Sequence, residues 1–230
     1  MKRLAAALTL AAVAAIPLAA TAQDRPQRSG RANPSAVIAA ELAFARLARD
    51  KGQWTAFRET AADDAVMFVP QRVNAREWLR KRADPAESVR WQPHAVWMSC
   101  DGSLAVTRGA WQQADGRQGY FTTVWRPRKK GGYEWVMDQG DGLAEPLPAP
   151  EMISASVAAC ERVPPVERVA AIGQQHGSAS TDRSLQWAVS VDARCGRIVT
   201  VRINRGGSAG FEDVLNARVV PPASPASCPP

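Results

Sequence analysis

Histidine is scarce in this chain of 230 residues, which contains only His94 and His176. The two lie far apart in the sequence, and the spacings of the four cysteines fit no zinc module. Neither histidine has an evident acidic partner, and no glycine-rich phosphate-binding motif occurs. We therefore expect no metal, no cofactor and no Ser-His-Asp catalysis.

Long apolar runs are also scarce, and the single clear example lies at the N-terminus. Met1-Lys2-Arg3 precedes an alanine- and leucine-rich stretch that ends in Ala20-Thr21-Ala22, the small-x-small pattern cleaved by signal peptidase. We expect residues 1–22 to be a signal peptide and the mature protein to begin at Gln23. The protein would then be periplasmic or secreted, without stable membrane insertion.

Positive charge is in modest excess, with a formal net charge of +7. The densest basic stretches, residues 25–31 and 126–130, contain no interleaved aromatic residues on which bases could stack. The sequence therefore gives no support for nucleic-acid binding.

The cysteines of an exported protein are expected to form disulfides, and four of them allow three pairings. Proximity in sequence favours a bond between Cys195 and Cys228. Cys100 would then pair with Cys160 and tie the two halves of the chain together.

Helical periodicity dominates the start of the mature chain, after an expected disordered tail at 23–34. We expect Ser35 to cap a helix that ends near Gly52, with larger apolar residues at three- and four-residue spacings. A second helix is expected over 53–63, a short strand over 65–69 and a third helix, capped by Asn74, over 75–83.

Alternating apolar residues follow, separated by Asp-Gly and Gly-Gly turns. They predict antiparallel strands over 90–99, 103–113, 118–126 and 133–139. Three helices followed by a bent antiparallel sheet make an α+β domain over 35–143.

The composition changes at a proline-rich stretch near residue 147. Residues 144–183 are expected to be a linker with a short helix over 153–163 and irregular structure up to 183. Residues 184–230 are expected to form a small three-stranded β meander with a proline-rich tail.

Several stretches of the first domain resemble the NTF2-like superfamily. They are Trp54-Thr-Ala-Phe57, Ala62-Asp-Asp-Ala65-Val, Gly109-Ala-Trp111, Gly119-Tyr-Phe-Thr-Thr-Val-Trp125-Arg126 and Gly132-Tyr-Glu-Trp135-Val-Met-Asp138. Residues 36–143 are most similar to the bacterial branch labelled DUF4440 or SnoaL-like. The resemblance implies a cone in which the bent sheet wraps around the helices and leaves a pocket, and it makes a sheet-to-sheet homodimer an expectation.

Asp138 near the end of the last predicted strand is the main candidate for catalysis. Alternation places it on the cone side, where partial desolvation would raise its pKa and make it a possible general base. It could instead have a structural role, accepting hydrogen bonds from a tryptophan indole or from backbone N–H groups. His94 is a second, weaker candidate base.

Aromatic residues would line the pocket in a ligand-binding cone. Arg108 could meet an acidic ligand. The candidate ligand-binding residues are Trp54, Phe68, Arg108, Trp111, Tyr120, Phe121, Thr123 and Trp125.

These features favour an exported protein that binds a small apolar or amphipathic molecule. One alternative is an isomerase, dehydratase or hydrolase with Asp138 as general base. The other is a homodimeric interaction module that uses the outer face of the sheet and the C-terminal meander.

Overall fold

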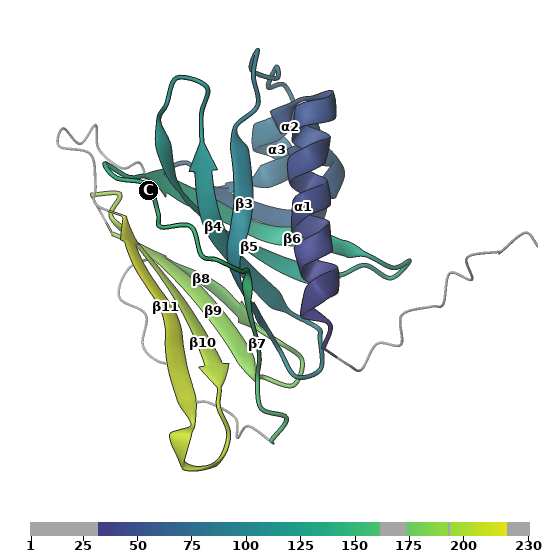
Figure 1. Ribbon diagram of the computed structural model, residues 1–230, viewed down its shortest axis with the longest axis vertical. Coiled ribbons are helices and arrows are strands. Elements are labelled where there is room, and N and C mark those ends of the chain that lie inside the picture. Colours follow the sequence, from purple (N-terminus) through teal and green to yellow (C-terminus); the bar gives the residue numbers. More distant parts are fainter. Residues whose placement is uncertain (1–31, 162–173, 193, 220–230) are drawn as a thin grey trace, which may run out of the picture.

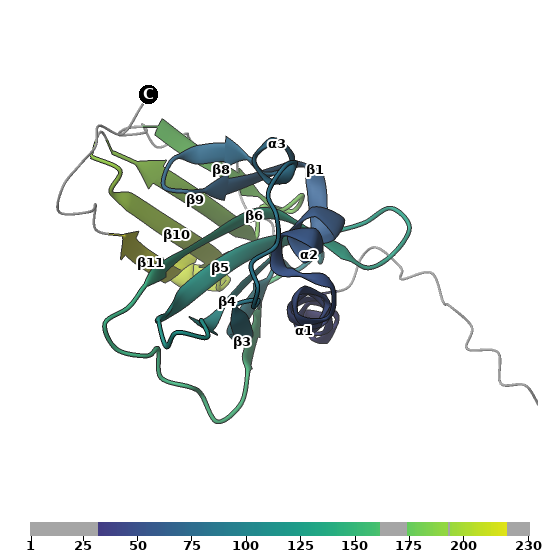
Figure 2. The same cartoon turned by 90° about the horizontal axis from the view of Figure 1, so that it is seen from above.

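The computed structural model describes residues 32–161, 174–192 and 194–219. It is an α+β protein with few helices and a large mixed sheet, arranged in three layers (Figures 1 and 2). Within the described residues, no helix is long and apolar enough to cross a bilayer. The helices are α1 (Pro34–Lys51), α2 (Gln53–Thr60), α3 (Ala75–Leu79) and the 3-10 helix η1 (Gly207–Ala209). The strands are β1 (Ala61–Phe68), β2 (Arg72–Asn74), β3 (Arg90–Met98), β4 (Ala105–Gln112), β5 (Gln118–Pro127), β6 (Tyr133–Gly142), β7 (Ser154–Val157), β8 (Gln174–Ala179), β9 (Leu185–Val191), β10 (Arg197–Asn204) and β11 (Phe211–Val219).

The central layer is a seven-stranded sheet in the order β2-β1-β6-β5-β4-β3-β7. The sheet is mixed, whereas the sequence predicts an antiparallel one. β1 lies parallel to β6, and β7 lies parallel to β3. These two strands are reached by longer connections, so their direction was not fixed by a hairpin turn.

Both faces of this sheet are apolar. The inner face packs against the helices, and its buried side chains include Met67, Val96 and Trp125. The outer face carries Val106, Val124 and other apolar residues of the alternate register. A sheet that is apolar on both faces needs a cover on each side.

The second sheet, in the order β11-β10-β9-β8, covers the outer face. Figure 2 shows it on the side of the central sheet opposite to α1 and α2. Leu185, Val199 and Ile203 are fully buried in the core shared by the two sheets. The surface expected to form a sheet-to-sheet homodimer is therefore occupied by the protein's own C-terminal half.

Helix α1 begins two residues earlier than expected, and its cap differs. The side chain of Asn33 accepts the N–H of Ala36, so Asn33 rather than Ser35 is the N-cap. Leu42, expected on the apolar face, is 46% exposed. The buried face of α1 consists of Val37, Glu41, Phe44, Ala45 and Ala48.

Three predictions for short elements are wrong. Residues 61–63 belong to β1 and not to the end of a helix, and α3 ends at Leu79 rather than near residue 83. Residues 154–157, expected within a helix, form β7, because they pair with Ala95–Met98 along the free edge of β3. Long-range pairing has overridden the helical preference of the alanines in this segment.

The C-terminal region has one more strand than expected. Gln174–Ala179 forms β8 within a segment that was expected to be irregular, and it pairs with β9. The described part of the extension is thus a four-stranded antiparallel sheet rather than a three-stranded meander. The segment has few β-branched or aromatic residues, so its pairing partner determines its structure.

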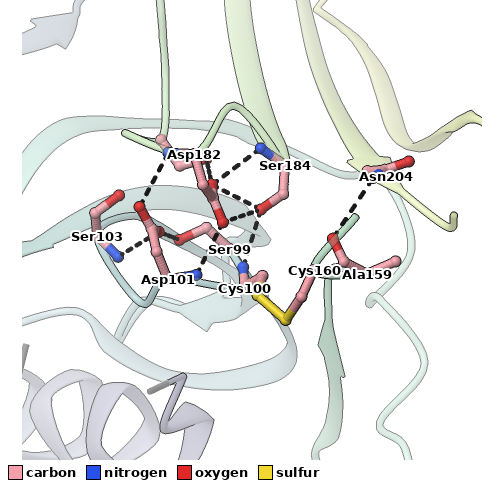
Figure 3. The surroundings of a disulfide bond; sticks show 10 residues. Ser99, Cys100, Asp101, Ser103, Ala159, Cys160, Asp182, Ser184 and Asn204 are labelled. Atoms are coloured by element: carbon pink, nitrogen blue, oxygen red, sulfur yellow. Dashed lines mark hydrogen bonds between the residues drawn. A yellow bond between two sulfur atoms is a disulfide. The ribbon is translucent and has the colours of Figure 1, made fainter. Parts of the chain in front are cut away.

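Two turns with the same pattern, Ser-x-Asp-x-Ser-Leu, join the sheets at one end. They are residues 99–104, between β3 and β4, and residues 180–185, between β8 and β9. The backbone N–H of Asp101 donates to the Asp182 carboxylate at 2.9 Å, and the N–H of Asp182 donates to the Asp101 carboxylate at 3.0 Å. Figure 3 shows how the two turns contact each other through these reciprocal bonds. Each carboxylate thereby caps the partner turn as well as its own.

A disulfide lies beside these turns. Cys100 and Cys160 are bonded, with their Cα atoms 5.1 Å apart (Figure 3). The neighbouring Ala158 donates its N–H to Met98 in the first sheet, and Ala159 donates to Asn204 in the second. Cys195 is also disulfide-bonded, and Cys228, its expected partner, lies outside the described residues.

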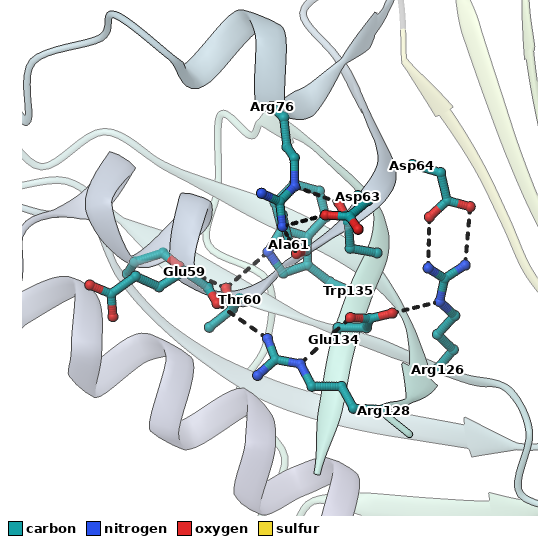
Figure 4. A network of polar contacts seen from close by, with 12 residues as sticks. Glu59, Thr60, Ala61, Asp63, Asp64, Arg76, Arg126, Arg128, Glu134 and Trp135 are labelled. Atoms are coloured by element: carbon teal, nitrogen blue, oxygen red, sulfur yellow. Dashed lines mark hydrogen bonds and ion pairs between the residues drawn. The ribbon is translucent and has the colours of Figure 1, made fainter. Parts of the chain in front are cut away.

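An ion-pair network stabilises the corner between α2, β1 and the β5–β6 hairpin (Figure 4). Arg126 forms a bidentate pair with Asp64 at 2.7 and 3.1 Å and contacts Glu134 at 2.8 Å. Asp63 pairs with Arg76 at 2.8 Å. These groups are largely exposed, so each pair contributes little to stability by itself.

We expect the reciprocal turn contacts to matter for stability. Asp182→Ala should lower the free energy of unfolding by about 2–4 kcal/mol, because it leaves several part-buried N–H and O–H donors without an acceptor. Asp115→Ala is the matched control, since the Asp115 side chain accepts bonds from Arg117 in its own exposed turn and, among the described residues, from no other part of the fold. Urea unfolding of both variants checks this, and equal losses in the two would contradict it.

Candidate functional site

A cavity of about 230 Å³ lies between the helices and the inner face of the central sheet. Side chains from α1 and α2 form one wall, and β1, β3, β4, β5 and β6 supply the other. Its aromatic lining residues are Phe44, Trp54, Phe57, Trp91, Trp111 and Phe121. Its polar lining residues are Gln53, Gln113, Thr123, Asp138, Gln139 and Asp141.

Asp138 lines this cavity from β6. The Thr123 hydroxyl donates to its Oδ2 atom at 2.7 Å. The pKa of Asp138 is raised to about 7, mainly by burial and less by the neighbouring Glu41, and the hydrogen bond from Thr123 partly opposes this rise. A carboxyl group with this pKa exchanges a proton readily near neutral pH.

Glu41 is a second buried acid that the sequence analysis did not identify. It lies on α1, fully buried, and three side chains donate to its carboxylate. These donors are Trp91 at 2.8 Å, Thr107 at 2.6 Å and Trp125 at 3.1 Å. Burial raises the pKa of Glu41 against the effect of these bonds. Its place on the buried face of α1, four residues after Val37 and three before Phe44, is the signal that could have revealed it.

The two acids are connected across the sheet by a row of residues in register. Thr107 on β4 pairs with Thr123 on β5, and Thr123 pairs with Asp138 on β6. Thr107 contacts Glu41, and Thr123 contacts Asp138. The charge on one acid therefore affects the protonation of the other.

A β-bulge in β6 determines which residues share a face with Asp138. The register with β5 shifts between the Val124–Met137 and Trp125–Trp135 pairs. Strict alternation along β6 would place Trp135 on the face opposite to Asp138, but the bulge at Val136 brings it to the same inner face. There the indole N–H of Trp135 donates to the Thr60 hydroxyl at 3.0 Å.

Trp111 forms one end of the cavity, with its indole N–H bonded to the carbonyl of Tyr120 at 3.0 Å. Its ring lies directly on Gly119, where an added Cβ would come within 2.4 Å of the indole. Glycine at position 119 is therefore required for this orientation of Trp111.

Five of the predicted site residues line the cavity: Trp54, Trp111, Phe121, Thr123 and Asp138.

The other predicted site residues lie elsewhere. Trp125 is buried beneath the cavity, bonded to Glu41. Phe68 and Tyr120, expected in the pocket, lie in the core between the two sheets, because their alternation directs them outward. Arg108 also lies outside the cavity, with its guanidinium 4.7 Å from the Tyr120 ring centroid.

His94 lies in a separate groove of about 720 Å³ beside β3 and β4. Burial and the nearby Arg108 lower the pKa of His94, so its ring is neutral near pH 7. His94 does not contact the two acids through any hydrogen bond within the described residues. The structure thus does not place the two candidate bases together.

Neither a metal centre nor a serine nucleophile elbow is visible among the described residues. They contain no group of three or more His, Cys, Asp or Glu side chains placed to hold a metal ion. Residues 206–210 fit the Gly-x-Ser-x-Gly pattern of hydrolases, but they form a 3-10 turn between β10 and β11. A nucleophile elbow requires a strand, a sharp turn and a helix.

Comparisons with known proteins give only distant likenesses. No protein-family model matches the chain, and no curated protein matches it. Similar solved structures include a Parabacteroides distasonis protein provisionally assigned as a ketosteroid isomerase, with 14% identity and a TM-score of 0.40 over 52% of this chain and 94% of that one. Another is an NTF2-like protein of unknown function from Mesorhizobium loti, with 16% identity and a TM-score of 0.32 over 48% of this chain and 93% of that one. Sequence identities and TM-scores this low establish neither the family nor the activity of this chain.

The raised pKa of Asp138 predicts a specific pH dependence of stability. Because the folded-state pKa lies above the unfolded value, the penalty for burying the ionised form of Asp138 is absent at pH below about 4 and grows as pH rises to about 7. Asp138→Asn should therefore stabilise the protein by about 1–4 kcal/mol above pH 7 and by little near pH 4. Urea unfolding across this range measures the difference.

The control for this prediction is Glu41→Gln. Removing the charge of Glu41 should lower the pKa of Asp138, as followed by the carboxyl ¹³C shift in an NMR titration. An Asp138 titration at the usual aspartate value in the unmodified protein would contradict the prediction.

Proposed function

We propose that this protein binds a small apolar or amphipathic molecule in the cavity between α1, α2 and the inner face of the central sheet. The observation that most directly supports this proposal is the aromatic wall around that cavity. A concave, mostly apolar site with a few convergent polar groups is the usual form of a small-molecule site.

The aromatic wall is well suited to keep its shape without a ligand. Phe44 packs edge-to-face on Phe57 and on Trp91, with ring centroids 4.8 and 4.9 Å apart. Trp54 packs on Phe57 at 5.5 Å. Rings held in such contacts lose little freedom on binding, which favours affinity.

The size of the cavity limits the ligand. Its volume of about 230 Å³ lies below the range of about 300–1,000 Å³ that is typical for drug-sized ligands. A ligand enclosed there would be small, or would extend beyond the cavity.

We further propose that the first half of the chain is an NTF2-like domain of the DUF4440 or SnoaL-like branch, exported to the periplasm. The order of helices and strands and the pocket between them support the family. The N-terminal pattern and the Cys100–Cys160 disulfide support an oxidising compartment.

Binding can be tested with N-phenyl-1-naphthylamine, a neutral aromatic dye whose emission rises in apolar sites. The protein is purified from the periplasmic fraction. If it is exported as proposed, its N-terminal residue is Gln23. We expect saturable binding that Val89→Trp weakens at least about tenfold, because Val89 lines the cavity and a larger side chain fills it.

Leu42→Trp is the matched control, since it adds an indole on the exposed side of α1. Equal binding by both variants would show that the dye binds elsewhere, and absence of binding would remove support for a ligand site.

A second candidate function is proton transfer with Asp138 as the general base. The observation in its favour is the pKa of about 7 for a carboxyl group that lines an apolar cavity. Such a base is largely ionised slightly above neutral pH and is poorly solvated, and both properties favour proton abstraction from carbon.

The test is elimination of 5-nitrobenzisoxazole, in which a base removes the proton from C3, the N–O bond breaks, and a coloured cyanophenolate forms. We expect the rate to rise with pH through about 7 and Asp138→Asn to lower it by about 100-fold or more. Asp141→Asn, in the wall of the same cavity, should change it much less. A rate that is the same in the Asp138 variant would exclude this function for Asp138.

A further inference from the structure

A groove of about 720 Å³ runs along the first half of β3. β7 pairs only with Ala95–Met98, so the stretch 90–94 has no strand on that side among the described residues. Instead, the connection from β6 to β7 forms the outer wall of the groove, through Pro146, Leu147 and Ala149.

The groove and the cavity adjoin each other at two tryptophans. Trp91 and Trp111, which are paired neighbours on β3 and β4, line both spaces. A molecule in the cavity would have to pass these two indoles to reach the groove. The groove is about three times as large as the cavity and so offers the space that the cavity lacks.

The charges of the two spaces are opposite. Arg49 and Arg90 line the groove, no acidic side chain does, and neither arginine has an ion-pair partner within the described residues. The cavity, in contrast, is lined by Asp138 and Asp141.

This separation determines the orientation of a bound ligand. An anionic group in the cavity would lie against carboxylates in a poorly solvated space, which is unfavourable. In the groove the same group would keep its contact with water and meet two unpaired guanidinium groups, which bind carboxylates and phosphates in a bidentate manner.

We propose that the ligand is an amphipathic anion, with its apolar part in the cavity and its anionic end in the groove at Arg49 and Arg90. This inference rests on the proposed ligand-binding function and specifies its ligand class. Both arginines are exposed, so together they should favour an anionic ligand over its neutral counterpart by about tenfold at low ionic strength.

The experiment compares decanoate with decan-1-ol, which share a chain length and differ in the charged end. Each is used to displace N-phenyl-1-naphthylamine from the cavity of the mature protein, and the ratio of the two half-displacing concentrations is measured. We expect decanoate to act at about one-tenth the concentration of the alcohol, with a ratio that falls as salt is added. In Arg49→Gln/Arg90→Gln the ratio should approach one.

The matched control is Arg46→Gln/Lys51→Gln, which also removes two positive charges, both from α1 and both at exposed ion pairs outside the groove. It should keep the tenfold ratio. A ratio near one in the unmodified protein, or a tenfold ratio retained in Arg49→Gln/Arg90→Gln, would overturn the inference while leaving the proposed ligand site intact. Failure of the dye to bind at all would overturn both.

Discussion

The structure depends on one constraint, the need to cover a sheet that is apolar on both faces. The helices cover the inner face and β8–β11 cover the outer one. The two covers differ in kind, because a second sheet packs closely along its whole face, whereas a curved sheet closed by helices leaves space near its open end. The cavity lies in that space, and Thr123 and Asp138 of the polar row line it.

Much of the first half could be predicted from the sequence, because local signals there agree with the tertiary structure. Asn74 caps α3, Gly52 ends α1, and the turns at Asp101-Gly102 and Gly131-Gly132 separate strands. Prediction failed where pairing partners decide the structure. Ser154–Val157 and Gln174–Ala179 are strands because β3 and β9 offer free edges, and neither edge is visible in the local sequence.

The candidate site could be predicted in part for the same reason. Alternation placed Thr123 and Asp138 on the cavity side, and both line it. It failed for Trp135, because a single extra residue at Val136 reverses the alternation. Glu41 was missed because a charged residue among apolar helix positions is normally read as a break in the buried face. Its burial depends on three hydrogen-bond donors from distant strands, and the local sequence does not show them.

The paired turns at 99–104 and 180–185 have a consequence for how this end of the molecule can vary. Each turn provides the amide group that the other turn's aspartate binds, so the length of each is set by the other. An inserted residue in one would displace the N–H and the carboxylate of both. The hairpin ends near Asp115 and Gly131 have no such contacts among the described residues and can accept longer loops. At the paired turns, by contrast, a change of length in one turn requires a matching change in the other.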